Sequence, residues 1–367
     1  MARVKLEDVC ERGSSNLKQS DVVDKDGDYP IYGASGYIGN VDFYHQEQPY
    51  VAVVKDGAGI GRTTLHPAKS SVIGTMQYLL PKGNVLPEYL CYVVKYMHLE
   101  KYFTGATIPH IYFKDYKNEE FNLDSLDRQK EIVSTLNKIE KVIESRTKEL
   151  ELLDELIRAR FVEMFGNPDV NEKNWNVYKM EQLCEVGSSK RIYQNDQSLT
   201  GIPFLRISDL VNRMDTGSKD CDLFIPEELF EKFKKQGLVP ARGDILLTAR
   251  GTLGRCYIIQ DEDEFYFQDG MITWLSKYDE RITPLYISCL FEMPGFRKQI
   301  DSLQAGSTVA YLSISMTKKL NVMTPPIELQ NQFADFVTQV DKSKVEIQKA
   351  LNKTQMLFDS LMQEYFG

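Results

Sequence analysis

The sequence carries two copies of one segment, and this internal repeat constrains the fold more than any other feature. Residues 5–15 (KLEDVCERGSS) recur 174 positions later as residues 179–189 (KMEQLCEVGSS), and the pair at 165–166 (FG) recurs at 366–367. Solenoid repeats are roughly 20 to 50 residues long, so copies of this size indicate duplication of a whole domain. We expect two similar heads in one molecule, related by approximate twofold symmetry.

Each copy ends in a segment with a coiled-coil pattern. In residues 125–166 the apolar side chains alternate at spacings of four and three, and the same register continues in residues 326–367. Heptads of this length predict two helices of about 40 residues, each about 60 Å long, that pair along an apolar seam. The expected helix–helix seam consists of Ile132, Leu136, Ile139, Ile143, Leu150, Leu153 and Ile157, with Phe333, Val337, Val340, Ile347, Leu351, Phe358 and Leu361.

The second helix follows a whole domain after the first, so the two can pack antiparallel. The alternative is a core-facing helix inside each head, which rarely needs so long a seam. Ser125 is a suitable cap for the first helix. Pro325 and Pro326 suit the first turn of the second helix, where no amide hydrogen bond is lost.

The segments before these helices are typical of mixed α/β (α+β) domains. Short apolar runs at residues 50–54, 71–74, 76–80, 244–248 and 271–275 predict strands, because turns rich in Gly, Asp and Pro separate them. A helix that begins with proline follows in each copy, at residues 87–90 and 284–287. The sequence therefore predicts a first head at 1–124, a long helix at 125–166, a second head at 167–325 and a second long helix at 326–367.

Composition narrows the class of protein. The hydrophobic content of 42% and charged content of 26% are ordinary for a globular protein, and no apolar stretch is long enough to span a bilayer. The six scattered cysteines include no Cys-x-x-Cys pair, which favours buried thiols and a cytoplasmic location. The net charge of −9 gives no support for nucleic-acid binding, so a DNA site would need a local basic face.

A Gly-Arg pair occurs at the same place in both heads. The glycine-rich run at residues 57–61 leads into a strand-like segment, so it indicates a tight β-turn rather than a nucleotide-binding loop, which needs a helix directly after it. Arg62 and Arg255 end the two turns, with Lys55 or Arg250 just upstream. Such side chains can reach phosphates or the acceptor edge of guanine, or simply form surface salt bridges.

A second motif, a Gly-Thr turn, places hydroxyls beside aromatic rings. Small hydroxyls bond phosphates or base edges, and rings contact thymine methyl groups or unpaired bases, although these residues could equally be structural. The candidates are Thr107, His110 and Tyr112 in the first head and Ser307, Thr308 and Tyr311 in the second. Lys190, Arg191 and Arg206 add basic groups to the second head, and Tyr32, Ser35 and Tyr37 add polar and aromatic groups to the first.

Motifs for catalysis are missing. The sequence has no P-loop, no Asn-Pro-Pro-aromatic segment for amino-methyl transfer and no zinc-binding pattern. The four histidines and the carboxylates show no metal-ligand or nuclease-like spacing. We therefore expect a binding protein with no catalytic residues, no metal and no cofactor of its own.

The order head, long helix, head, long helix resembles the specificity subunit of type I restriction–modification systems over the whole chain. The segments that carry the resemblance lead from the Gly-Thr turn into the long helix, at residues 105–132 and 306–330. Gln129 and Gln330 match the glutamine of the family's pattern in the first turns of the helix. The first copy departs from the pattern, since residues 123–125 (LDS) lack the family's prolines.

The resemblance implies that each head is a target recognition domain for one half of a split, asymmetric DNA sequence, with the antiparallel helices fixing the gap. The residues expected to bind DNA are Lys55, Arg62, Thr107, His110, Tyr112, Lys190, Arg191, Arg206, Arg250, Arg255, Ser307, Thr308 and Tyr311. The resemblance further implies two modification subunits, which carry S-adenosylmethionine and methylate adenine. Restriction subunits that use ATP and Mg²⁺ can join them.

Three other functions remain open at this point. The chain could be the specificity chain of a related type II restriction system, or a coiled-coil scaffold whose heads bind protein. It could also be an enzyme with a cryptic methyltransferase or nuclease site, although the missing motifs argue against that.

Overall fold

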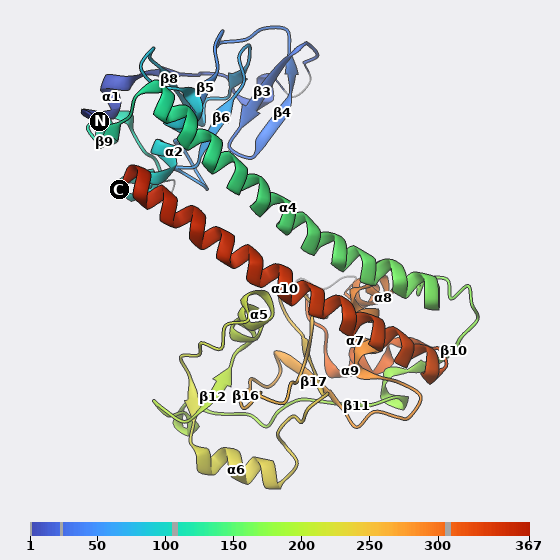
Figure 1. Ribbon diagram of the computed structural model, residues 1–367. Helices are drawn as coiled ribbons and strands as arrows, with labels where there is room; N and C mark the ends of the chain where they lie inside the picture. The colour runs from blue at the N-terminus through green and yellow to red at the C-terminus, as the bar shows by residue number, and fades with distance from the viewer. Residues whose placement is uncertain (1, 23–24, 105–108, 305–309) are drawn as a thin grey trace. The chain divides into compact units, whose positions relative to one another are not determined.

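The computed structural model describes residues 2–22, 25–104, 109–304 and 310–367, and the chain forms two compact units (Figure 1). Unit 1 comprises Met1–Lys148 and Ile347–Gly367, and unit 2 comprises Glu149–Glu346. Each unit therefore contains one head together with one end of each of two long helices.

Unit 1 is built on three small sheets. Its strands are β1 (Ala2–Lys5), β2 (Cys10–Ser14), β3 (Tyr29–Gly33), β4 (Gly36–Val41), β5 (Tyr50–Val54), β6 (Thr63–His66), β7 (Ser71–Val72), β8 (Met76–Pro81) and β9 (Glu120–Leu123). An antiparallel sheet has the order β2-β8-β5-β6. A second sheet has the order β4-β3-β7, in which β3 and β7 run parallel, and β1 pairs with β9.

Unit 2 repeats this topology strand for strand. Its strands are β10 (Asn176–Lys179), β11 (Glu185–Gly187), β12 (Ile202–Leu205), β13 (Phe224–Ile225), β14 (Ile245–Thr248), β15 (Cys256–Ile258), β16 (Tyr266–Phe267), β17 (Ile272–Ser276) and β18 (Asn321–Thr324). The sheets have the orders β11-β17-β14-β15, β13-β12-β16 and β10-β18, and β12 and β16 run parallel as β3 and β7 do. The two mixed α/β copies predicted from the sequence are confirmed, as are the five predicted strands.

The short helices complete each head. Unit 1 has α1 (Leu6–Val9), α2 (Pro87–Tyr96), α3 (Phe113–Tyr116) and the 3-10 turns η1 (Gln19–Asp21) and η2 (Leu99–Tyr102). Unit 2 has η3 (Met180–Gln182), η4 (Gln194–Asp196), α5 (Ile207–Thr216), α6 (Glu227–Lys235), α7 (Pro284–Glu292), α8 (Pro294–Leu303) and α9 (Ile314–Lys319). Proline occupies the first turn of both α2 and α7, as predicted.

The sequence of the central strand β5 is apolar at every position and does not alternate between apolar and polar residues. Val51 and Val53 pack in the cluster that contains the buried face of α2, whereas Tyr50, Ala52 and Val54 pack in a separate cluster on the other side of the strand. Both faces of the strand are thus covered, and every residue of it is buried. A strand covered on both faces is apolar throughout rather than at every second position.

The two long helices are α4 (Leu126–Phe165) and α10 (Ile327–Phe366), each of 40 residues. The Ser125 hydroxyl caps α4 by accepting a hydrogen bond from the Arg128 amide at 3.4 Å. In unit 1 the start of α4 and the end of α10 share one core, which includes Leu136 and Phe366. In unit 2 the end of α4 meets the start of α10, where the Phe165 and Phe333 rings lie 5.3 Å apart. No helix in the described part of the chain is long and apolar enough to cross a membrane.

The burial of α4 follows the seam predicted from its sequence. Between residues 141 and 160, the residues that are not exposed follow the heptad spacing, with the single addition of Asp154. They are Ile143, Arg146, Leu150, Leu153, Asp154, Ile157 and Arg160. The polar members have partners within their own unit. Arg146 Nη1 donates to the Ala350 carbonyl at 2.5 Å in unit 1, and Lys344 Nζ lies 2.6 Å from Asp154 Oδ1 in unit 2.

A buried glutamine fastens each long helix to its head. In unit 1 the Gln129 amide accepts from the Leu86 amide at 2.8 Å and donates to the carbonyls of Asn84 and Asp124. In unit 2 Gln330 accepts from the Thr283 amide at 2.9 Å and donates to the carbonyls of Arg281 and Pro325. Both glutamines are fully buried, so they satisfy backbone groups that would otherwise lack a partner.

Candidate nucleic-acid interface

The same pair of backbone hydrogen bonds closes the Gly-Arg turn in both heads, although the turn of unit 1 is one residue longer. In unit 1 the Gly61 amide donates to the Val54 carbonyl and the Val54 amide donates to the Arg62 carbonyl, each at 2.9 Å. In unit 2 the amides of Gly254 and Thr248 donate to the carbonyls of Thr248 and Arg255, also at 2.9 Å. Each turn leads into a strand, β6 or β15, which confirms the tight β-turn.

Close packing explains the glycine before each arginine. Gly61 has a φ of +80°, and a Cβ there would lie 2.6 Å from the Glu100 amide nitrogen. Gly254 has a φ of +74°, and a Cβ there would lie 3.1 Å from the Ile300 side chain. Any side chain would be strained at these positions. The glycines are therefore required by the backbone of the turns.

The segment after each Gly-Thr turn pairs with the Gly-Arg turn of the same head. In unit 1 the Ile111 amide donates to the Lys55 carbonyl at 2.9 Å, and Asp56 forms a β-bridge with His110. In unit 2 the Leu312 amide donates to the Ala249 carbonyl at 3.0 Å, and Arg250 forms a β-bridge with Tyr311. Two motifs that lie far apart in the sequence thus form one surface in each head.

In unit 1 this surface brings together three of the residues named from the sequence. His110 Nδ1 lies 2.6 Å from Asp56 Oδ1, and Lys55 Nζ lies 3.5 Å from Asp56 Oδ2. Tyr112 is 50% exposed, and its ring stacks on the His110 ring at 6.4 Å. Lys114 Nζ lies 5.4 Å from the centre of the Tyr112 ring. The sequence analysis did not name Asp56, which occupies the position in unit 1 that Arg250 occupies in unit 2.

Arg62 points to another part of the same head. Its Nη1 donates to the Ala34 carbonyl at 3.0 Å, in the turn between β3 and β4. Ser35 belongs to this turn, and Tyr37, the second residue of β4, is 63% exposed. Ala34, Ser35, Tyr37 and Thr75 are among the residues that line a hollow of about 460 Å³. The arginine therefore links the Gly-Arg turn to the β3–β4 turn.

Arg255 makes the corresponding link in unit 2. Its Nη2 lies 2.6 Å from Asp215 Oδ1, and this hydrogen bond holds the pKa of the Asp215 carboxyl below its usual value. Asp215 belongs to α5, which lies in the connection between β12 and β13, where unit 1 has its β3–β4 turn. Arg62 and Arg255 therefore contact equivalent connections, each in its own head. The connection is a short turn in unit 1 and contains the helix α5 in unit 2.

A buried ion pair fixes α5. Arg213 Nη2 lies 3.2 Å from Asp263 Oδ1, and their side chains are only 7% and 2% exposed. The Tyr257 hydroxyl donates to both Asp263 oxygens, at 2.9 and 3.1 Å. The pKa of Tyr257 is raised to about 12, mainly by burial and to a lesser extent by this hydrogen bond. The Arg213 guanidinium also lies 4.8 Å from the centre of the Phe265 ring.

The other basic residues named in unit 2 are engaged within the protein. Arg250 lies over the Tyr311 ring at 5.2 Å. Arg191 Nε lies 2.9 Å from Asp269 Oδ2, and Lys190 Nζ lies 5.5 Å from the centre of the Phe233 ring. Arg206 makes a bidentate contact with Asp209 at 2.9 and 3.1 Å and precedes the first residue of α5. Thr107, Ser307 and Thr308 lie outside the described residues.

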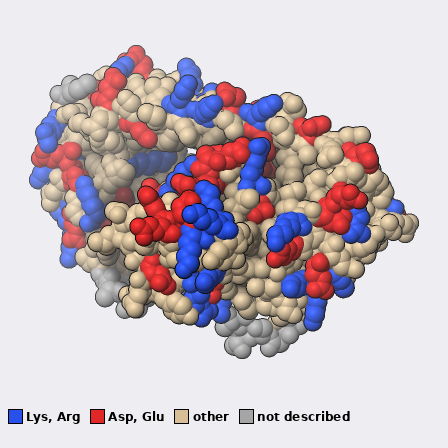
Figure 2. Space-filling view, turned by 90° about the horizontal axis from the view of Figure 1, so that it is seen from below, with Lys and Arg blue, Asp and Glu red and all other residues tan. Residues whose placement is uncertain are grey.

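The face of the molecule shown in Figure 2 is neither uniformly basic nor uniformly acidic. Lysine and arginine side chains are intermixed with aspartate and glutamate on the face shown in Figure 2. Within the described ranges, no group of three His, Cys, Asp or Glu side chains is placed to hold a metal ion. The repeat-equivalent thiols Cys10 and Cys184 are buried as predicted, and burial raises the pKa of each to about 12.

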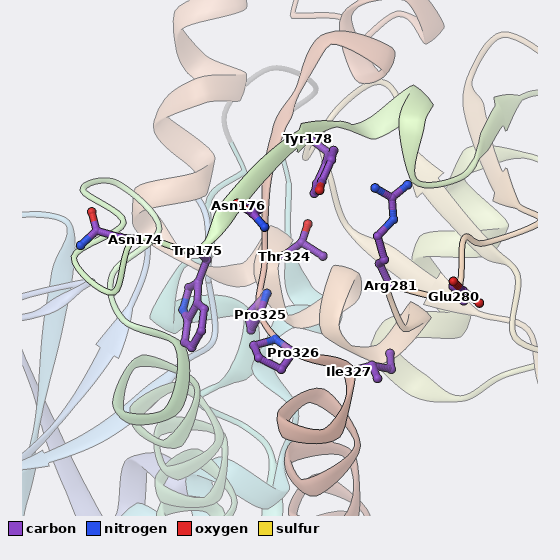
Figure 3. A pocket seen from close by; sticks show the side chains of 10 residues that line it. All are labelled: Asn174, Trp175, Asn176, Tyr178, Glu280, Arg281, Thr324, Pro325, Pro326 and Ile327. Carbon is purple, nitrogen blue, oxygen red and sulfur yellow. The ribbon is translucent and has the colours of Figure 1, made fainter.

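A pocket of about 670 Å³ lies in unit 2 between β10, β18 and the first residue of α10 (Figure 3). Trp175, Pro325 and Pro326 are among the residues that line it, and Arg281 stacks on the Tyr178 ring at 4.4 Å. The pocket contains none of the residues expected to bind DNA. A bidentate hydrogen bond to Asp279 raises the pKa of Arg281, so this cation is already engaged.

Comparisons with known proteins agree with the duplicated architecture. The sequence model of a family described as "Type I restriction modification DNA specificity domain" matches residues 1–155 and 172–354. A protein of Haemophilus influenzae named as a type I restriction enzyme specificity subunit is 25% identical over 324 residues, which cover 85% of this chain and 80% of that protein. The MjaVIII specificity subunit of Methanocaldococcus jannaschii is 24% identical over 332 residues, which cover 83% of this chain and 76% of that protein.

A solved structure shares the fold. The crystal structure of the type I restriction–modification S subunit from M. genitalium aligns with a TM-score of 0.62 at 15% sequence identity. The alignment covers 100% of this chain and 96% of that one.

Proposed function

The chain belongs to the family of type I restriction–modification DNA-specificity proteins, and from this premise we propose that it recognises a bipartite, asymmetric DNA target with one head per half-site. The observation that carries the proposal is the surface formed in each head by the Gly-Arg turn and the segment after the Gly-Thr turn. The same backbone hydrogen bonds and the same β-bridge form it in both heads, but its side chains differ: Asp56 and His110 in one, Arg250 and Tyr311 in the other. Equal scaffolds with unequal side chains suit the reading of two different half-sites.

We further propose that α4 and α10 form an antiparallel coiled coil that acts as a spacer. Support comes from the two shared cores, in which opposite ends of the helices meet, and from the heptad burial of α4. A stiff link makes binding of the second head effectively intramolecular once the first is bound. The expected benefit is avidity for a pair of half-sites at one fixed separation.

In this proposal the chain has no catalytic role and acts with partner subunits. Two modification subunits, each with S-adenosylmethionine, would methylate adenine in the two half-sites, and restriction subunits would bring ATP and Mg²⁺. The net charge of −9 and the intermixed surface charges suggest that the partners supply much of the phosphate contact. We therefore expect weak DNA binding by this subunit alone.

Alanine substitution of the repeat-equivalent arginines tests this assignment. In the reconstituted methyltransferase, Arg62→Ala should weaken discrimination in one half-site and Arg255→Ala in the other. A lost base contact should reduce discrimination by about 1–3 kcal/mol. The measurement is the methylation rate on targets with single base changes in each half-site. Each variant serves as the control for the other, and unchanged discrimination in both half-sites would remove these arginines from the recognition surface.

A further inference from the structure

The two β-bridges place side chains of opposite chemistry at the same position of the fold. The register follows from the turns: Val54 in unit 1 has the hydrogen-bonding role of Thr248 in unit 2, and the next residue accepts from Ile111 or Leu312. The residue after that is Asp56 in one head and Arg250 in the other. Lys55, which the sequence pairs with Arg250 as an upstream cation, instead matches Ala249.

Asp56 and Arg250 each contact the aromatic side chain of their partner in the β-bridge. The Asp56 carboxylate meets His110 Nδ1 at 2.6 Å, and the Arg250 guanidinium lies 5.2 Å from the centre of the Tyr311 ring. Stacking on an aromatic face fixes the plane of a guanidinium and leaves its in-plane N–H donors available. Arg255, Arg191 and Arg206 differ in this respect, because their guanidinium groups contact carboxylates.

Both positions are open to a ligand. Arg250 is exposed, and the side chains of Asp56 and His110 are 30% and 38% exposed. Lys55 Nζ lies 3.5 Å from Asp56, so a cation accompanies the carboxylate and reduces its repulsion from DNA phosphates. Gln304 holds the backbone of Tyr311 on both sides, by accepting from its amide at 2.8 Å and donating to its carbonyl at 3.0 Å.

We propose that this bridge position reads one base pair in each half-site, with opposite hydrogen-bonding polarity in the two heads. Arg250 donates to the O6 and N7 acceptors of a guanine, the commonest specific contact of arginine in the major groove. Asp56 accepts from the N4 amino group of a cytosine in the other half-site. This inference rests on the proposed function and specifies the bases that the two heads read.

The test uses the full-length protein in the methyltransferase complex, with a DNA library in which both half-sites of the wild-type target are varied one base at a time. Arg250→Ala should lose about 5- to 140-fold of the preference for guanine at one position of one half-site. Asp56→Ala, which removes the acceptor that asparagine would keep, should lose a similar preference for cytosine at one position of the other. All other positions should keep their wild-type preferences.

Two control variants match these changes in charge. Arg242→Ala removes an exposed arginine that precedes β14, the strand that Arg250 follows. Glu47→Gln removes an exposed carboxylate that precedes β5, the strand that Asp56 follows. Both should leave every base preference unchanged.

The inference is overturned if Arg250→Ala slows methylation of all sequences equally, which would indicate a phosphate contact. It is also overturned if Arg250→Ala alters the preference only at positions where the wild-type complex does not select guanine. These outcomes leave a bipartite wild-type target in place, so they are distinct from failure of the proposed function, in which the wild-type complex would show no bipartite target.

Discussion

Insertion of one heptad into both long helices is expected to abolish methylation of the wild-type target and to create activity on a target with a longer gap. Seven residues lengthen a helix by about 10 Å, which corresponds to about three base pairs of DNA. A whole heptad keeps the seam in register, because the apolar residues recur every 3.5 positions on average. Insertion near residue 148 of α4 and near residue 346 of α10 lengthens the helices at the boundary of the two units.

The measurement is methylation of a series of DNAs in which the gap between fixed half-sites increases one base pair at a time. Activity should move to a gap about three base pairs longer, and size-exclusion chromatography should show that the complex still assembles. The same heptad placed in α4 alone is the control, since it leaves helices of unequal length and should remove activity on every gap. Unchanged activity of the double insertion on the wild-type gap would contradict a spacer role for the helices.

Removal of the buried carboxylate of Asp263 is expected to cause the largest loss of stability. Asp263→Ala leaves the Arg213 guanidinium buried without its charge partner and removes the acceptor of the Tyr257 hydroxyl. Breaking a buried ion pair in this way costs about 3–5 kcal/mol. The loss should appear in the free energy of unfolding of the head that contains α5, measured by urea denaturation.

Asp261→Ala is the matched control for that experiment. Asp261 pairs with Arg242 at 3.0 Å, but their side chains are 68% and 76% exposed, so its removal should cost no more than about 1 kcal/mol. If Asp263→Ala were no more destabilising than Asp261→Ala, the buried pair would not be what holds α5. Another contact would then have to hold α5, and with it Asp215, beside Arg255.

The sequence predicted the parts of the fold that depend on local patterns. The heptads marked both long helices, and apolar runs such as residues 50–54 marked the central strands. Gln129 and Gln330 were visible only as members of a family pattern. Their role became clear once the structure showed each amide bonded to three backbone groups of its own head.

The candidate site was harder to predict because it depends on contacts between distant segments. The bridge between Asp56 and His110 joins residues 54 positions apart, and no local pattern fixes its register. The sequence analysis noted Lys55 and Arg250 only as cations upstream of the Gly-Arg pairs. The two turns differ in length by one residue, so an alignment on these pairs does not match Asp56 with Arg250, and the reversal of charge between the heads was not visible. The carboxylates that pair with Arg191 and Arg255 are also distant in the sequence. Arg206 pairs with the nearby Asp209, but this contact depends on the side-chain conformation. None of these three ion pairs could be predicted from the sequence.

Recognition of one half-site by each head is tested most directly by mapping the adenines methylated by the complex of this subunit with its modification subunits. We expect one motif composed of two different half-sites, separated by a fixed number of unspecified base pairs, with one methylated adenine in each half. A motif without a gap, or two identical half-sites arranged as a palindrome, would contradict the assignment of one head to each half-site.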